Sequence, residues 1–248
     1  MLITTSDTSS AGHVMVTADD VPAHLRRWLD DSPIGSIFRH PLCVQILPTL
    51  LPMPLEAYLA ERSCARVAAW QASGDPFDFI VRTERPFRMD SLVALASLVP
   101  SRFTTPAAAI RFWRAAAWAW MDAEHSETDP IWGTLLAAPV PLRAAMTAAG
   151  ARRRLAAMPG TLTLYKGVAD PDPAHDAVAL ARTGWSWSLS CETARWFARR
   201  GARVSGAVLT ARIRRDDVVA FLDARGEDEI VTSPAAVHCP VISETWSH

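Results

Sequence analysis

"GWSWSLSCETARWFARR", residues 184–200, changes from the period of a strand to the period of a helix within a few residues. Trp185 and Trp187 alternate with Ser186 and Ser188, so on an extended chain the tryptophans face one side and the serines the other. The letters that follow, ETARWFARR, have the spacing of a short amphipathic helix. A strand that is buried on both faces does not carry a row of hydroxyl groups. The serine face is therefore either solvated surface or the wall of a functional site.

The overall composition is that of a globular protein with a hydrophobic core. Of 248 residues, 50% are hydrophobic and 21% are charged, and the formal net charge is −1. This balance gives no electrostatic reason to expect nucleic acid or an anionic membrane as a partner. The four cysteines lie far apart without a CxxC pair, which indicates free thiols in a reducing compartment and predicts no metal site.

The first 20 residues lack both a basic start and a continuous apolar run. They are interpreted as a polar tail and not as a secretory signal. No stretch reaches the roughly 20 uninterrupted apolar residues that a membrane-spanning helix requires. The sequence therefore predicts a cytoplasmic protein without a membrane partner, a location compatible with delivery into another cell.

Helical patterns dominate residues 21–158, which are predicted to form a helical lobe. Pro54 and Gly74 bracket one long helical pattern. In a later one, Trp113 and Trp120 share a face at helical spacing. Packing in a core explains such aromatic residues better than a ligand-binding box does.

The pattern changes to strands from Thr161, just after a run of arginines (Arg152–Arg154) that is interpreted as a solvated helix face. The segments TLTLYKG, GWSWSLS and GAVLTARIR alternate as strands, with one short helix inserted. There is no βαβ series and no GxGxxG or Walker loop, which argues against Rossmann and P-loop nucleotide sites. The sequence predicts an α+β fold in three parts: a tail over residues 1–20, the helical lobe over 21–158 and a sheet domain over 159–248.

Two polar features lie on the first strands of the sheet domain. Lys166 follows an apolar strand and precedes Gly167. Alone, it is a cation at a strand end whose stem packs while its head stays in water. Ser186 and Ser188, taken alone, form the solvated face of an antiparallel strand.

A third polar feature opens a late strand. Glu227 and Glu229 flank Asp228, and alternation along a strand would place the two glutamates on the same face. Two negative charges on the same face of a strand repel each other, so this spacing is a mild indication of a functional site. A charged turn that leads into an edge strand is the simpler alternative.

In this order, the three features resemble the Arg-Ser-Glu class of mono-ADP-ribosyltransferases. The matching pieces are LYKG, GWSWSLSCETARWFA and RGEDEIV, within residues 160–235. The resemblance implies a helical lobe followed by a split, strongly bent β-sandwich whose cleft holds NAD. It implies an enzyme that transfers ADP-ribose from NAD to a macromolecule and releases nicotinamide, with protein arginine as the first acceptor to expect. Such chemistry suits a bacterial or phage toxin.

The resemblance also implies roles for the acidic residues and the first serine. Glu229, the second acid of E-x-E, would stabilise the positive charge that develops on the ribose when the bond to nicotinamide breaks. Glu227 would orient or deprotonate the acceptor. Ser186 would hydrogen-bond the ribose or hold Glu229 in place.

Three further residues complete the NAD site that the resemblance implies. Ser188 would face the cleft, and Lys166, next to Gly167, would bind the NAD phosphates. The family has arginine where this chain has Lys166, its only lysine among 25 basic residues. Lysine lacks the two-pronged fork of arginine, so looser NAD binding is expected. Replacing Lys166 is expected to change stability little, because a cation at a strand end supports little packing.

Two other functions stay open beside the transferase. A chain with an altered cation is compatible with a catalytically impaired binding module of the same fold. The same site would make an NAD hydrolase if water were the acceptor. Nucleic acid is a second acceptor, suggested by arginines around the short helix (Arg195, Arg199, Arg200 and Arg203), for which a solvated helix face is the simpler explanation.

Overall fold

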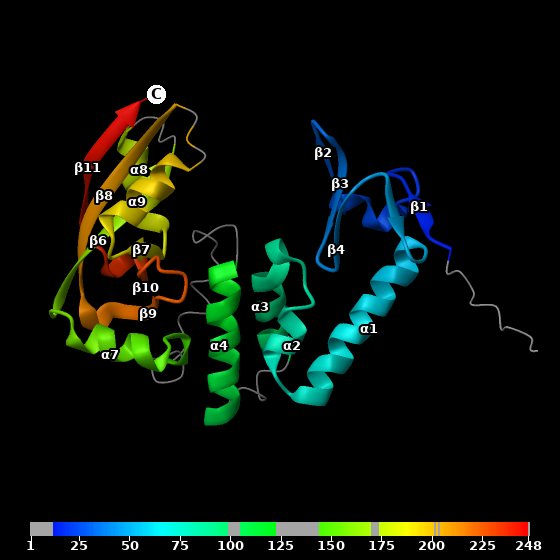
Figure 1. Ribbon diagram of the computed structural model, residues 1–248, viewed down its shortest axis with the longest axis horizontal. Coiled ribbons are helices and arrows are strands. Elements are labelled where there is room, and N and C mark those ends of the chain that lie inside the picture. Colours follow the sequence, from blue (N-terminus) through cyan, green and yellow to red (C-terminus); the bar gives the residue numbers. More distant parts are fainter. Residues whose placement is uncertain are drawn as a thin grey trace, which may run out of the picture. The chain divides into compact units, whose positions relative to one another are not determined.

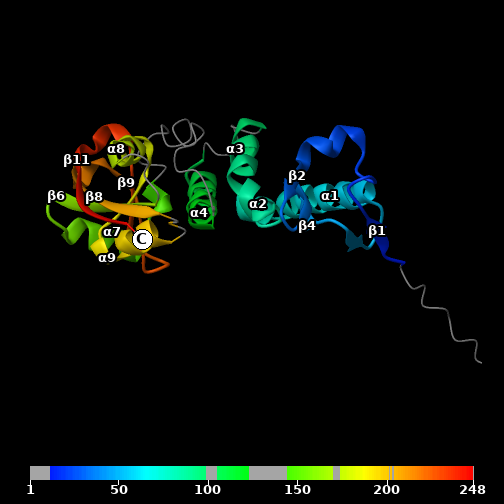
Figure 2. The same cartoon turned by 90° about the horizontal axis from the view of Figure 1, so that it is seen from above.

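The computed structural model describes residues 12–98, 105–122, 144–169, 174–200, 202 and 204–247. By their internal contacts they fall into two compact units, Met1–Ser91 and Leu92–His248. Both units combine helices with antiparallel sheets, as Figures 1 and 2 show from two directions. The α+β class predicted from the sequence is confirmed.

The first unit contains two small antiparallel sheets. One pairs β1 (Val14–Val16) with β5 (Thr49–Leu51), and the other joins β2 (Leu29–Ser32), β3 (Gly35–His40) and β4 (Cys43–Ile46). The helical elements are η1 (Ala23–Trp28), α1 (Leu55–Ser73), α2 (Pro76–Ile80), η2 (Arg85–Phe87) and α3 (Arg88–Leu98), which crosses the boundary between the units.

These strands contradict the expected helical lobe over 21–158 and, at β1, the expected polar tail over 1–20, of which residues 1–11 lie outside the described residues. They are three to six residues long, too short to give a clear period of two in the sequence. Gly35, with φ +121°, turns the chain from β2 into β3 in a backbone region that favours glycine. Val16, inside the expected tail, is buried in the core of this unit.

The long helix predicted in this unit is confirmed. α1 begins directly after Pro54, its N-cap residue, and ends at Gly74, whose φ of +65° is the left-handed C-cap typical of glycine. Leu55 and Leu59 lie one turn apart on the buried face of this helix and pack into the core of the unit.

A six-stranded antiparallel sheet forms the centre of the second unit, in the order β11-β8-β6-β7-β10-β9. Its strands are β6 (Thr161–Ala169), β7 (Ser186–Ser188), β8 (Ser205–Arg214), β9 (Val218–Leu222), β10 (Glu229–Thr232) and β11 (His238–Ser247). The helical elements are α4 (Pro106–Asp122), η4 (Ala144–Met146), α7 (Ala149–Ala157), α8 (Ala174–Thr183), α9 (Cys191–Arg199), η5 (Arg215–Asp217) and η6 (Pro234–Ala236).

The sheet is interrupted in its middle. β6 pairs with β8 along its whole length, but it pairs with β7 only through Tyr165 and Ser188. β7 instead pairs along its whole length with β10, where Ser188 lies opposite Glu229. The sheet thus consists of two three-stranded halves, β11-β8-β6 and β7-β10-β9, joined at one residue pair. We call the pair Tyr165–Ser188 the seam.

Different helices cover the two faces of this sheet. One face carries the main core, in which Leu164, Trp187 and Ile230 pack with residues of α7 and α8. On the other face, α9 packs Ala194 and Ala198 against β8. The side predicted for Trp187 is therefore correct, since only 2% of this residue is exposed.

The boundary between the two units falls at residue 91 and not at residue 158. α4 and α7, which the sequence analysis assigned to the helical lobe, belong to the same compact unit as the sheet. Thr147, just after η4, accepts a 3.0 Å hydrogen bond from the backbone N–H of Phe221 in β9. The predicted division was wrong because helical periodicity shows that a helix buries one face, but not which sheet it packs against.

Candidate active site

A pocket of about 210 Å³ lies at the seam of the sheet. Its walls come from β6, β7, α9 and the residues at the start of β10. The lining residues are Tyr165, Lys166, Gly167, Ser186, Trp187, Ser188, Thr193, Ala194, Phe197, Glu227 and Glu229. All six site residues predicted from the sequence are among them, so the structure brings together three segments that are separated by up to 63 residues of chain.

The carboxylate of Glu229 is held by two donors on one oxygen. The hydroxyl of Ser186 lies 2.5 Å from Oε1 of Glu229, and the indole N–H of Trp120 donates to the same oxygen at 2.8 Å. Ser186 reaches Glu229 because β7 and β10 are paired strands whose side chains alternate between the two faces. Two hydrogen bonds fix the direction in which this carboxylate points.

Lys166 lies deeper in the sheet than a strand-end cation would. β6 runs on to Ala169, and only 8% of Lys166 is exposed. Its Nζ donates a 3.0 Å hydrogen bond to the backbone carbonyl of Ser186 and lies 5.7 Å from the ring centre of Trp187. Lys166 therefore bridges β6 and β7 beside the seam. The premise that it is a strand-end cation that supports little packing is wrong, so its removal is now predicted to lower stability.

Gly167 forms its part of the pocket wall with backbone alone. A Cβ atom at this position would lie 2.0 Å from the carbonyl oxygen of Ala194 and 2.6 Å from the backbone nitrogen of Ala198. Real Cβ atoms do not approach backbone atoms so closely, so a side chain here would push α9 away from the sheet. The close approach explains why glycine follows Lys166.

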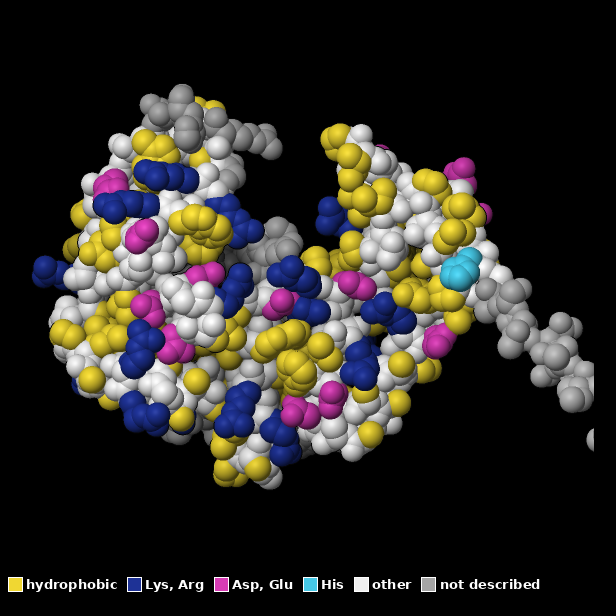
Figure 3. All heavy atoms as spheres, viewed as in Figure 1, with side chains coloured by type: hydrophobic (Ala, Val, Ile, Leu, Met, Phe, Trp, Pro, Cys, Tyr) yellow, Lys and Arg dark blue, Asp and Glu magenta, His cyan; other side chains and the backbone are white. Residues whose placement is uncertain are grey.

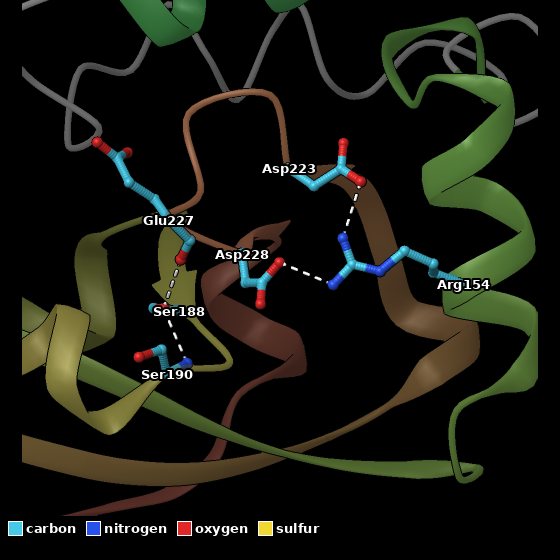
Figure 4. A network of polar contacts seen from close by, with 6 residues as sticks. All are labelled: Arg154, Ser188, Ser190, Asp223, Glu227 and Asp228. Atoms are coloured by element: carbon cyan, nitrogen blue, oxygen red, sulfur yellow. Dashed lines mark hydrogen bonds and ion pairs between the residues drawn. The ribbon is translucent and has the colours of Figure 1, made fainter.

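Ser188 uses its hydroxyl to join two backbone segments. The hydroxyl donates to the carbonyl of Glu227 at 2.7 Å and accepts from the backbone N–H of Ser190 at 2.9 Å, as Figure 4 shows. Ser190 in turn caps α9, accepting from the N–H of Thr193 at 3.1 Å. Ser188 thus ties the turn before β10 to the start of α9 and fixes the distance between two walls of the pocket.

Glu227 and Asp228 lie in a turn and not in a strand, because β10 begins at Glu229. Asp228 has a left-handed backbone with φ +46°. The two side chains leave the turn in different directions: Glu227 lines the pocket, and Asp228 points toward Arg154 (Figure 4). Both glutamates line one pocket, as predicted, but the turn at Asp228 brings them together and not the alternation of a strand.

Arg154 is a residue that the sequence analysis missed. Its guanidinium lies 2.9 Å from Oδ2 of Asp223 and 3.0 Å from Oδ1 of Asp228, so it joins both ends of the turn that carries Glu227 (Figure 4). Hydrogen bonds to Asp228 and Asp223 raise the pKa of Arg154. The sequence shows three adjacent arginines with no sign of which one has partners about 70 residues away.

The helix α9, which forms one wall of the pocket, carries aromatic and basic side chains. Phe197 lines the pocket, and Trp196 beside it is 53% exposed and carries the guanidinium of Arg200 at 5.0 Å from its ring centre. Arg195 pairs with Glu244 and Arg199 lies over Trp246, while Arg203 lies outside the described residues. On the face of this unit visible in Figure 3, basic and acidic side chains are interspersed.

Comparisons with models of protein families, with curated proteins and with solved structures found no match for this chain. Among the described residues, no helix is both long and apolar enough to cross a membrane. The part of the chain that the structure describes also contains no group of three or more metal-ligating side chains.

Proposed function

We propose that the chain is an NAD-dependent mono-ADP-ribosyltransferase of the Arg-Ser-Glu class. The observation that carries the proposal is the pocket at the seam, where Lys166, Gly167, two serines and two glutamates meet although they come from three separate segments. The interrupted sheet supports the split β-sandwich that such an enzyme would have. In this proposal NAD is a co-substrate and no metal takes part.

Glu229 would act on the ribose of NAD. When the bond between the nicotinamide nitrogen and C1′ breaks, nicotinamide leaves as a neutral molecule and the sugar becomes positively charged. A carboxylate fixed in advance beside the ribose stabilises this charge without reorganising during the reaction. The 2.5 Å hydrogen bond from Ser186 supports this role, because it orients the carboxylate before substrate arrives.

Glu227 would act on the acceptor. Glu227 is one of the residues that line the same pocket, and its carboxylate lies 3.5 Å from Nε of Arg225, a contact with a guanidinium that supports this role. In the transfer step a guanidinium nitrogen of the acceptor bonds to C1′, and its proton passes to Glu227. An arginine side chain matches this carboxylate better than a neutral hydroxyl does, which favours protein arginine over nucleic acid as the acceptor.

The pocket would hold only the reacting half of NAD. Its volume of about 210 Å³ is below the range of about 300–1,000 Å³ typical of sites that enclose a whole drug-sized ligand. Lys166 supplies the positive charge of the wall and would attract the phosphates while it holds β7 in place. The four cysteines are free thiols, which supports a reducing, cytoplasmic setting.

The test is incubation of the protein with NAD labelled on the adenylate, together with a cell lysate. Label on macromolecules that protease releases supports transfer to protein, and label that nuclease releases indicates nucleic acid. Free ADP-ribose without labelled macromolecules indicates an NAD hydrolase. No turnover at all contradicts the proposal and favours a binding module. The control is Glu244→Gln, which removes a carboxylate that pairs with Arg195 outside the pocket.

A further inference from the structure

The geometry points to Trp120 as a positioning residue for Glu229. The helix α4, which carries Trp120, would then contribute directly to the candidate active site. This inference rests on the proposed function and extends it to a helix that lies outside the segments of the resemblance. Trp120 and Glu229 are 109 residues apart, and the indole N–H lies 2.8 Å from Oε1 of the carboxylate.

The indole is a specific partner for a carboxylate. Its N–H donates and cannot accept, so it binds acceptor atoms only, whereas the hydroxyl of Ser186 rotates and can do both. Trp120 is 7% exposed and lies on the buried face of α4 with Trp113 and Ala116. A donor fixed by packing on a helix holds Oε1 in one place, and the plane of the carboxylate then sets the direction of Oε2.

Core packing alone does not account for this contact. The indole N–H groups of Trp28, Trp187 and Trp246 are buried without a hydrogen-bond partner within the described part of the chain. Because this protein buries other indoles in that way, a tryptophan in its core does not need to reach a carboxylate. The direction of the Trp120 N–H toward Glu229 is therefore a separate property of the site.

The end of α4 also touches the turn that carries the other glutamate. Arg225 donates to the backbone carbonyl of Met121, the residue after Trp120, and its Nε lies 3.5 Å from Oε1 of Glu227. One end of α4 thus contacts Glu229 directly and Glu227 through Arg225. We infer that this helix end sets the positions of both carboxylates relative to each other.

The test compares Trp120→Phe with Trp113→Phe, a matched change on the same buried helix face that does not reach Glu229. NAD cleavage by Trp120→Phe should show a kcat about tenfold or more below the wild type, with KM nearly unchanged, because a hydrogen bond to a charged group is lost at the reacting carboxylate. Trp113→Phe should keep the wild-type kcat. In a Glu229→Gln background, Trp120→Phe should cause no further loss.

A second readout does not depend on activity. Unfolding midpoints of the wild type, Trp120→Phe, Glu229→Gln and the double variant form a cycle that should show coupling between the two side chains. If Trp120→Phe does not fold, benzothienylalanine at position 120 replaces the N–H by sulfur and keeps the ring shape.

Different outcomes separate this inference from the proposed function. A wild type that cleaves NAD, with equal kcat in the two phenylalanine variants, overturns the positioning role alone. So does a further loss in the Glu229→Gln background, or a cycle without coupling. A wild type that does not cleave NAD overturns the proposed function and the inference with it.

Discussion

Arg154 and Asp228 are joined across a turn of unusual backbone geometry. The guanidinium lies 3.0 Å from Oδ1 of Asp228, whose φ of +46° belongs to the left-handed region that few residues other than glycine, asparagine and aspartate adopt. The side chain of Asp228 is thereby held on the side of the turn opposite Glu227 (Figure 4). We therefore expect the ion pair to help orient Glu227, a residue that it does not contact.

Loss of this ion pair should therefore change acceptor transfer more than stability. In Arg154→Gln, the turn is released at both Asp223 and Asp228, and transfer of ADP-ribose to protein should fall severalfold while NAD hydrolysis changes less. The melting temperature should hardly move, because ion pairs at exposed side chains contribute little. Arg153→Gln, the adjacent exposed arginine, is the control. Equal loss of transfer in both variants would remove the role of Arg154.

The two glutamates should differ in what their removal abolishes. Glu229→Gln keeps the shape and removes the charge, and NAD cleavage should fall by about a hundredfold or more, the scale of losing one preorganised electrostatic contact. Glu227→Ala should suppress transfer to protein more than hydrolysis of NAD. Both rates are measured from released nicotinamide and from label on the acceptor. Near wild-type cleavage by Glu229→Gln would show that this carboxylate has another task.

Lys166 should affect both stability and NAD affinity. Lys166→Met fills the buried space but removes the donor to the carbonyl of Ser186, so the free energy of unfolding should fall by about 1–3 kcal/mol. NAD affinity should fall about tenfold or more in Lys166→Met, because a charged contact is lost, and should rise in Lys166→Arg. Calorimetry with NAD and thermal unfolding measure the two effects. If the wild type, Lys166→Met and Lys166→Arg all bind NAD with the same affinity, Lys166 does not contact the NAD phosphates.

Gly167 should tolerate no side chain. In Gly167→Ala the new Cβ would meet backbone atoms of Ala194 and Ala198, which cannot move aside as the end of a flexible side chain can. We expect the free energy of unfolding to fall by about 3 kcal/mol or more, which is at the upper end of overpacking effects. Gly160→Ala is the matched control, since nothing lies within 4 Å of a Cβ at Gly160. Urea unfolding of both variants decides whether the close approach of α9 exists in solution.

The local patterns of the second unit were predictable from the sequence. The alternation in GWSWSLS predicts the strand β7 and the burial of Trp187. Ser190 and the residues after it predict the helix α9 with its N-cap. Both features arise between neighbours in the chain, where periodicity and capping carry the information. The six residues that the order of the polar features singled out also line one pocket, and their roles remain predictions.

The contacts that refine the site were not predictable in the same way. Trp120 has the spacing of a core residue, and nothing near it in the chain shows that its N–H meets a carboxylate 109 residues later. Lys166 was expected at a strand end because glycine follows it, yet that glycine lies inside β6 to let α9 approach. Both cases depend on tertiary packing, which a single sequence does not display.

The contact of Gly167 with Ala194 also determines which way the pocket can widen. With no side chain between them, the backbones of β6 and α9 are in direct contact at Gly167 and Ala194, which leaves no room between these two elements. The opposite wall, on β7 and β10, is joined to β6 by one ladder pair, Tyr165–Ser188. Widening of the pocket would therefore require a turn of the β7-β10-β9 half about that pair, against the hydrogen bonds of Lys166 and Ser188 that hold this half in place.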